Sequence, residues 1–412
     1  MKGINDREGE LFIDEVSLND VVAQYGTPIY VYSASQLKKN LNRYLSSIRT
    51  EDKLCFSVKS NSNTHILSAL NKQGASFDVV SGNELKRCLE AGAKAEQIVF
   101  SGVGKSEEEL IFAIKQNIFS INVESEEELD RIISISKKLE RKANCMLRVN
   151  PDLSSTSHPY IQTGLKSSKF GILIEALDSV AQKALESNSI NIKGLASHVG
   201  SQVFDKKLIF ENLDLLIDLT NHLSLKNHQF SFIDIGGGFG LSYKDEEELN
   251  IEGIITEITS KLDSLNLNLI LEPGRSISGN SGLLLSKVEY LKKTSDMNFA
   301  ILDSGMNDLI RPALYKSWHN ISVITSNGEE ALEYKVVGPV CESGDTFGEN
   351  RTLSLSDDSI VAIHDAGAYG HVMSSNYNSR LKLPEVLVEG TEVILIRRRE
   401  TFDDLMKQER DV

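Results

Sequence analysis

Three patterns in the sequence predict an α/β protein, built as a (β/α)8 barrel with a second, all-β domain. From about Leu54 to Leu271, short β-rich runs alternate with amphipathic, helix-like stretches. After Arg275 the runs are strand-like without regular helices between them, and TPIYVYSAS near the N-terminus is also strand-like. Because parallel strands need crossover helices and antiparallel strands do not, the first pattern predicts a parallel barrel and the later runs predict an antiparallel sheet.

The alternating region supplies about eight strand–helix units. The expected strands are KLCFSV, SFDVV, QIVFSG, FSINV, CMLRVN, IKGLASHVG, FSFIDIGGG and LNLILEPG. Between them lie helical segments such as HILSALNKQG, GNELKRCLEAG, SEEELIFAIKQ and SEEELDRIISISKKLERK, and the last two open with Ser and a Glu three residues on, a capping-box pattern. An open doubly wound sheet is the alternative, although it usually has fewer strands.

The change of pattern also predicts the domain boundaries. Residues 36–275 form the barrel, residues 276–412 form the β-domain, and residues 1–35 add strand material to the sheet of the β-domain. The expected C-terminal strands include LLLSKVEYLKKT, NFAILDSG, YKVVGPV, SIVAIHDAG and TEVILIRRRE.

Composition narrows the function. The net charge of −15 argues against nucleic acid or an anionic membrane as the main partner, because both need a basic surface. The start MKGINDREGELFIDEV lacks the pattern of a signal peptide, and no apolar run approaches a membrane-spanning length, so we expect a cytoplasmic enzyme. The four cysteines are scattered and the eight histidines show no HExxH or HxH spacing, which argues against disulfides and a metal site.

Polar residues follow several of the predicted barrel strands, where βα loops build the active sites of such barrels. Lys59 comes directly after KLCFSV, and partial desolvation there would favour imine chemistry, although an isolated loop lysine is ordinarily solvated. His198, in SHVGSQ, follows another strand, where its ring could stack beside a phosphate or a cofactor. A lone histidine is more often a packed or surface residue.

Two later turns contain glycine. In DIGGGFG, Gly236, Gly237 and Gly238 would let the backbone approach an anion, at a barrel position that often binds phosphate; a plain turn is the alternative. In ILEPGRSI, Glu272 is suited to pair with a protonated ring nitrogen, and Arg275 is suited to bind a carboxylate. A structural Glu–Arg ion pair is the alternative for these two residues.

The β region contributes the strings GMNDLIRPALY, CESGD and DAGAYG. Arg311 and Tyr315 are four residues apart, so one helical turn would put both on one face. Cys341 beside Glu342 offers a proton donor and a carboxylate for an ammonium group, and Tyr369 in a flexible loop offers an exposed phenol for a phosphate. Taken singly, each of these residues is more often structural than functional.

Read in order, these strings resemble the fold-type III pyridoxal-phosphate decarboxylases, and most closely the diaminopimelate decarboxylases. The matching strings are FSVKSN, FDVVSGNEL, LRVNPD, HPYIQTGLKSSKFGI, HVGSQ, DIGGGFG, EPGRSI, GMNDLIRPALY, CESGD and DAGAYG. They lie in the family's order between about Phe56 and Tyr377, so the resemblance covers most of the chain. The departures from residues common in the family remove no charged or reactive group; they are Ser57, Ser60, Asn83 and Ser304.

The resemblance implies an alanine-racemase-like barrel, a β-domain and a head-to-tail homodimer with two shared active sites. Lys59 would form a Schiff base with pyridoxal 5'-phosphate, His198 would stack on the ring, and Glu272 would pair with the pyridine nitrogen. The other implied cofactor positions are Asp78, Arg148, Ser201, Gly236, Gly237, Gly238, Gly274, Arg275 and Tyr369. The implied substrate positions are Arg275, Arg311, Tyr315, Glu342 and Tyr369, with Cys341 as proton donor. Cys341 and Glu342 would enter the site from the partner subunit.

By this resemblance, the predicted reaction is decarboxylation of meso-2,6-diaminopimelate to L-lysine and CO2. The distal end of that substrate carries a carboxylate and an ammonium, which two arginines and a glutamate match in charge. The first alternative is a related decarboxylase acting on another amino acid or a carrier-bound aminoacyl group. A racemase with the same barrel and a cofactor-binding regulator without catalysis are further alternatives, against which CESGD and the full β-domain count.

Overall fold

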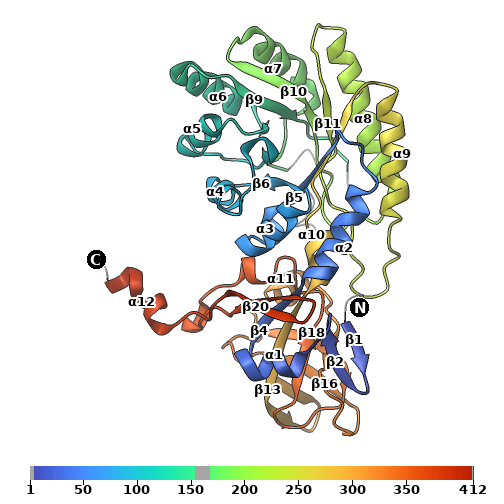
Figure 1. The fold of residues 1–412 in the computed structure, drawn as a ribbon, viewed down its shortest axis with the longest axis vertical. Helices are drawn as coiled ribbons and strands as arrows, with labels where there is room; N and C mark the ends of the chain where they lie inside the picture. Colours follow the sequence, from blue (N-terminus) through green and yellow to red (C-terminus); the bar gives the residue numbers. More distant parts are fainter. Residues whose placement is uncertain (1–3, 154–167, 411) are drawn as a thin grey trace. The chain divides into compact units, whose positions relative to one another are not determined.

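The chain forms two compact units in a computed structural model that describes residues 4–153, 168–410 and 412 (Figure 1). The barrel unit comprises Asn40–Gly240 and Glu247–Ser276, and the sheet unit comprises Met1–Lys39, Leu241–Glu246 and Ile277–Val412. The sequence places the boundaries after residues 35 and 275 and does not indicate that residues 241–246 belong with the sheet. These residues belong with the sheet unit because the ring of Tyr243 packs edge-to-face on His319, with ring centroids 5.3 Å apart.

Eight parallel strands close into a barrel, as the alternating pattern predicts. They are β5 (Lys53–Ser57), β6 (Ser76–Val79), β7 (Ile98–Phe100), β8 (Ser120–Val123), β9 (Ala143–Arg148), β10 (Ile190–Ala196), β11 (Phe232–Asp234) and β12 (Asn268–Leu271). The open-sheet alternative is wrong, because the last strand pairs with the first, with Ile270 opposite Lys53 and Leu271 opposite Leu54.

Helices follow the barrel strands and lie outside them (Figure 1). They are α3 (Thr64–Lys72), α4 (Gly82–Glu90), α5 (Glu107–Gln116), α6 (Glu126–Leu139), α7 (Ile174–Glu186), α8 (Lys206–Ser224) and α9 (Ile251–Asp263), and α2 (Ala34–Leu45) precedes β5. The capping box of α5 is confirmed: Ser106 and Glu109 each accept the other's backbone N–H, at 3.2 and 2.9 Å.

The second predicted capping box, at the start of α6, has one of its two hydrogen bonds. Ser125 accepts the N–H of Glu128 at 3.2 Å, but the Glu128 carboxylate accepts the N–H of Glu124 and the ammonium of Lys105 at 2.7 and 3.0 Å. Lys105 is buried. Leaving a buried ammonium without an opposite charge costs more free energy than leaving the N-cap without its second hydrogen bond, so Glu128 pairs with Lys105.

The sheet unit holds a nine-stranded sheet and a small three-stranded one. The large sheet contains β4 (Ile29–Ser33), β13 (Gly282–Lys293), β14 (Asn298–Leu302), β15 (Ile321–Val323), β16 (Leu332–Val337), β17 (Thr346–Leu353), β18 (Ile360–Ile363), β19 (Glu385–Glu389) and β20 (Glu392–Arg397). The small one contains β1 (Ile4–Arg7), β2 (Glu10–Ile13) and β3 (Val16–Ser17). Helices α1 (Leu18–Tyr25), α11 (Arg311–Tyr315) and α12 (Phe402–Arg410) also belong here, so the all-β expectation is too strict.

The expectation of a purely antiparallel sheet is wrong at two strand pairs. β4 runs parallel to β19, and β14 runs parallel to β16. Hairpins join only antiparallel strands, whereas these pairs are separated by long stretches of chain that leave either direction open. The pattern within each run cannot show this.

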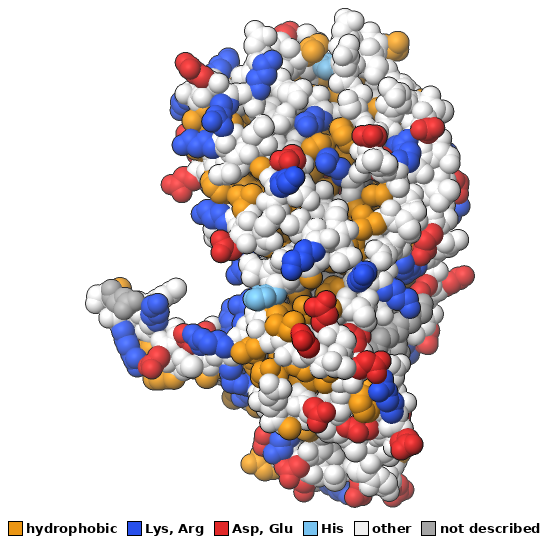
Figure 2. Space-filling model, viewed as in Figure 1, with side chains coloured by type: hydrophobic (Ala, Val, Ile, Leu, Met, Phe, Trp, Pro, Cys, Tyr) orange, Lys and Arg blue, Asp and Glu red, His pale blue; other side chains and the backbone are white. Residues whose placement is uncertain are grey.

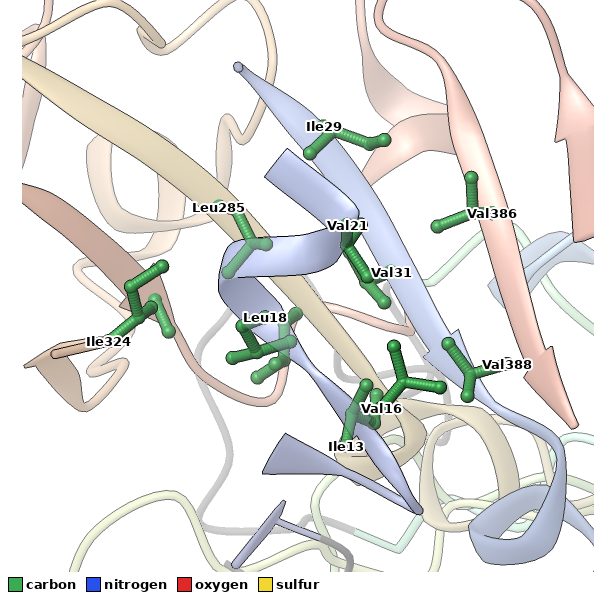
Figure 3. Packing of buried hydrophobic residues seen from close by; sticks show 12 residues of the cluster. Ile13, Val16, Leu18, Val21, Ile29, Val31, Leu285, Ile324, Val386 and Val388 are labelled. Atoms are coloured by element: carbon green, nitrogen blue, oxygen red, sulfur yellow. The ribbon is translucent and has the colours of Figure 1, made fainter. Parts of the chain in front are cut away.

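Apolar side chains from both ends of the chain form the core beneath the sheet (Figure 3). Ile29 and Val31 of β4 pack with Leu285 of β13 and Val386 of β19. Burying each such side chain contributes roughly 1.5–3 kcal/mol, so residues near the N-terminus help to stabilise a sheet whose other strands are C-terminal.

Charged side chains of both signs are interspersed on the face shown in Figure 2. Among the described residues on that face, no continuous basic stripe is visible. None of the described helices combines the length and the apolar character that crossing a bilayer requires.

Candidate active site

The side chain of Lys59 places an amine at the end of the first barrel strand. It lies in a short 3-10 turn, Val58–Ser60, directly after β5, and its Nζ donates to Oδ2 of Asp78 on β6 at 3.0 Å. Asp78 is fully buried and also accepts from the hydroxyl of Ser57 at 2.8 Å. The position of Lys59 after a strand does not by itself predict this ion pair with Asp78. Ser57 thus takes part in holding Asp78.

Two more carboxyl groups lie at the ends of neighbouring strands. Asp234 ends β11 and Glu272 follows β12, and their side chains hydrogen-bond to each other. Burial, together with the charges of Asp234 and Asp78, raises the pKa of Glu272 well above its usual range. Burial also raises the pKa of Asp234 to about 6. Arg275, the partner of Glu272 in the ion pair that the sequence leaves open as an alternative, donates to Ser201 at 3.1 Å.

His198 follows β10 and is held by the glycine turn. Its Nδ1 accepts the N–H of Gly237 at 3.3 Å, so this nitrogen carries no hydrogen. Burial, with Lys59 and Arg148 nearby, lowers the pKa of His198 well below its usual value. The ring is therefore a neutral, flat imidazole at neutral pH.

The glycine turn packs too tightly for side chains. Gly236 and Gly238 have φ of +71° and +88°, and a Cβ on Gly237 would lie 2.0 Å from the carbonyl oxygen of Glu272. The N–H of Gly236 is donated to Asp234 at 2.8 Å, and that of Gly237 to His198. Two of the three N–H groups expected to face an anion thus have partners inside the protein. Gly274 is similarly crowded, with a Cβ reaching 3.0 Å from Ser57 and Ser60.

Arg148, at the end of β9, has a partner that sequence reasoning missed. Its Nη1 lies 2.5 Å from Oε1 of Glu124, and the same carboxylate accepts the N–H groups of Gly102 and Gly171 at 3.0 and 2.9 Å. Glu124 follows β8 as Glu272 follows β12, so the position of an acidic residue directly after a barrel strand is the signal that could have identified it. The motif HPYIQTGLKSSKFGI lies largely outside the described residues.

Arg311 and Tyr315 lie in the sheet unit and form α11, which confirms the predicted helical turn. Arg311 is buried; its Nη1 lies 2.8 Å from Nε2 of His319, and its guanidinium carbon lies 4.5 Å from the ring centroid of Tyr243. Neither His319 nor Tyr243 was singled out from the sequence, because neither belongs to a motif that predicts chemistry.

The remaining candidates of the sheet unit lie in loops. Cys341 and Glu342 are exposed, and Oε1 of Glu342 accepts from the hydroxyl of Tyr377 at 2.5 Å. Tyr369 is half-buried, and its φ of +55° turns the chain sharply between buried neighbours. No group of three or more His, Cys, Asp or Glu side chains in the described part of the chain is arranged to hold a metal ion.

Comparison with known proteins gives the family. Residues 34–279 match the family model of the pyridoxal-dependent decarboxylases, pyridoxal binding domain. The chain is 42% identical to diaminopimelate decarboxylase of Pseudomonas fluorescens over 411 residues, covering 99% of each protein. It is 43% identical to that of Haemophilus influenzae over 403 residues, covering 97% of each.

A solved structure agrees along nearly the whole chain. Diaminopimelate decarboxylase of Helicobacter pylori, complexed with L-lysine, superposes with a TM-score of 0.92 at 39% identity, covering 95% of this chain and 99% of that one. Likeness at this identity and coverage extends through both units. The chain belongs to the diaminopimelate decarboxylases, a family of pyridoxal-phosphate-dependent enzymes with a barrel and a sheet domain.

Proposed function

We propose that this chain decarboxylates meso-2,6-diaminopimelate to L-lysine and CO2. The observation that carries the proposal is the set of groups that meet in the barrel mouth: the Lys59 amine, the neutral His198 ring and the buried Glu272 carboxyl. Full-length similarity to enzymes named for this substrate supports the choice among amino acids.

The barrel mouth fits pyridoxal phosphate. An aldehyde needs an amine such as Lys59, a ring nitrogen needs an acid such as Glu272, and the face of a ring needs a flat partner such as His198. In addition, Oδ1 of Asp78 is buried and has no hydrogen-bond partner in the described structure. An unsatisfied buried acceptor costs about 1–3 kcal/mol, so a donor on the cofactor would stabilise this site.

Bound pyridoxal phosphate supplies the electron sink that takes up the electron pair of the broken carbon–carbon bond. The residues of the chain bind and orient the cofactor and the substrate. Lys59 provides the covalent anchor, and Asp78 fixes its Nζ at 3.0 Å. Ser201, Gly274, Tyr369 and the glycine turn are proposed to hold the phosphate, and the Cys341 thiol is proposed to return a proton to the α-carbon. Arg148 is ion-paired with Glu124, and its charge helps burial to lower the pKa of His198.

Specificity is proposed to come from the distal end of the substrate. Arg275 and Arg311 would bind its carboxylate, Glu342 its ammonium, and Tyr315 and Tyr369 would line the site. The Arg275 guanidinium donates to the neutral hydroxyl of Ser201, and Nη1 of Arg311 lies beside the neutral ring of His319. A guanidinium is the side chain whose planar fork matches a carboxylate. A decarboxylase for a substrate without a distal carboxylate has no need of two such groups.

We further propose a homodimer in which Cys341 and Glu342 act in the partner's site. Both side chains are exposed on their own chain, as are the apolar residues Leu314, Tyr377 and Phe402. Helix α12, which extends away from the sheet, has no buried residue (Figure 1). The cytoplasmic location expected from the sequence belongs to the same proposal, and the exposed free thiol of Cys341 suits a reducing compartment.

One assay tests the function. Purified protein with pyridoxal phosphate is incubated with meso-diaminopimelate, and CO2 and L-lysine are measured in equal amounts. Lys59→Ala is the matched control, and ornithine, arginine and L-lysine are offered as competing substrates. Faster turnover of any of these would favour the alternative, a related decarboxylase for another amino acid.

A further inference from the structure

Three buried acidic residues lie at the barrel mouth in the described part of the chain. Asp78, Asp234 and Glu272 are 0%, 1% and 8% exposed. Within the described structure, the ammonium that hydrogen-bonds to this group is that of Lys59, and it bonds to Asp78. Three ionised carboxylates around one ammonium would leave two buried charges without a partner, which costs several kcal/mol per ion.

The contact between Glu272 and Asp234 resolves this excess. The two carboxyl groups are hydrogen-bonded to each other. An ionised carboxylate only accepts hydrogen bonds, so a carboxyl–carboxyl bond requires one proton between the two groups.

The surrounding donors decide which group is ionised. Asp234 accepts the N–H of Gly236 at 2.8 Å and the amide of Asn122 at 3.3 Å, both of which favour its carboxylate form. Among the described residues, the side chain that donates to the Glu272 carboxyl group is Ser101, over a long 3.4 Å. The proton therefore resides on Glu272, which donates to Asp234.

We propose that Asp234 is a positioning residue that keeps Glu272 protonated until pyridoxal phosphate binds. The inference rests on the proposed placement of Glu272 against the ring nitrogen. When that nitrogen arrives without a proton, the O–H bond of Glu272 breaks and an N–H bond forms at the ring. When it arrives protonated, the proton of Glu272 leaves to solvent. Either way, Glu272 ends as a carboxylate facing a cationic ring.

The other charged or titratable groups facing the pair do not remove the need for this proton. Asp78 on β6 adds repulsion, and Lys59 after β5 attracts. Cys55 on β5 stays a neutral thiol, because burial raises its pKa well above the usual value. Burial raises the pKa of both Glu272 and Asp234, which is the direction expected for two carboxyl groups that share a proton.

Infrared titration of the apoenzyme tests the proposal. The spectrum of Glu272→Gln is subtracted from that of the parent, which isolates the carbonyl band of a protonated Glu272 from other buried acids. The band should be present at neutral pH and disappear at higher pH. In an Asp234→Asn background, the same subtraction should give a midpoint lower by roughly one pH unit or more, since a like charge has been removed.

Asn122→Leu is the second variant, and its effect has the opposite sign. Loss of the amide donor disfavours the Asp234 carboxylate, so the pair should keep its proton to higher pH. A merely structural role would not shift the midpoint in opposite directions. Absence of the Glu272 band at neutral pH, or an unchanged midpoint in both variants, overturns the proposal.

Adding pyridoxal phosphate separates this inference from the proposed function. Cofactor binding, followed by its absorbance, should abolish the Glu272 band. A band that persists while the cofactor is bound would show that Glu272 does not face the ring nitrogen, which overturns its proposed role as the store of that proton. If the Glu272 band behaves as expected but the enzyme does not turn over diaminopimelate, the proposed substrate is wrong and the proposal about Asp234 and Glu272 stands.

Discussion

Nη1 of Arg311 lies 2.8 Å from Nε2 of His319, while Nδ1 of the same ring lies 2.7 Å from the carbonyl oxygen of His364. A carbonyl oxygen only accepts, so Nδ1 carries the hydrogen and Nε2 is the acceptor for the guanidinium. His319 is therefore neutral, and it orients Arg311 without cancelling its charge.

The first prediction concerns this orientation. His319→Phe removes the acceptor and should raise KM for meso-diaminopimelate by roughly three- to tenfold, the loss expected for one hydrogen bond of about 1 kcal/mol, with a smaller change in kcat. His319→Gln, whose amide oxygen can accept, should recover part of the loss. Steady-state kinetics of both variants measure this. An equal rise in KM for the two variants would contradict the proposed orientation of Arg311 by His319.

Arg311→Met keeps much of the apolar stem but loses the guanidinium. If Arg311 binds the distal carboxylate, kcat/KM for meso-diaminopimelate should fall by one to two powers of ten, since a hydrogen bond to a charged group is worth about 1.5–3 kcal/mol. L-lysine, as product, keeps that carboxylate and should inhibit the variant more weakly, whereas cadaverine, which has none, should inhibit both proteins equally. Equal weakening of both inhibitors would assign Arg311 to the fold or the cofactor.

Lys59→Ala should abolish turnover and the absorbance of bound cofactor. It also leaves the buried carboxylate of Asp78 without its cation, so the melting temperature should fall, by an amount equivalent to about 1–3 kcal/mol. The double variant Lys59→Ala/Asp78→Asn removes the charge and should regain most of that stability while staying inactive. Circular dichroism melting of the three proteins checks this, and an unchanged Lys59→Ala would show that the ion pair does not stabilise the barrel.

Subunit mixing tests the shared active site. Lys59→Ala and Cys341→Ala are each expected to be nearly inactive. If Cys341 serves the partner's site, random pairing of equal amounts should restore about a quarter of parental activity, because each mixed dimer holds one intact site. No recovery after demonstrated subunit exchange would place both residues in the site of one chain.

The last prediction is a pH dependence of stability. Burial lowers the pKa of His364 from 6.5 to about 4. Because the folded pKa lies below the unfolded one, the neutral ring contributes stability above pH 6.5 that is lost as the pH falls towards 4. His364→Gln, which can still accept from Ser322, should remove part of this loss, so its stability relative to the parent should improve by roughly 1–3 kcal/mol between pH 7 and pH 4.5. Denaturant unfolding at the two pH values measures it.

The sequence by itself determined the elements of the barrel. Each of its eight strands lies where a β-rich run was expected, because alternating apolar runs and amphipathic helices leave few ways to bury a parallel sheet. The sequence also predicted that Lys59, His198 and Glu272 follow barrel strands, which is where barrel active sites form.

Only the tertiary structure decided how those groups interact. Asp78, Asp234 and Glu272 come from strands far apart in sequence, and their hydrogen bonds depend on barrel closure, which local pattern does not encode. The same holds for Arg148 with Glu124, and for Arg311 with His319 and Tyr243. Strand direction in the sheet unit was likewise decided by long-range packing, because β4 and β19 meet from opposite ends of the chain. Sequence motifs indicate which residue types are present, whereas charge and protonation depend on burial and on neighbours that only the folded chain brings together.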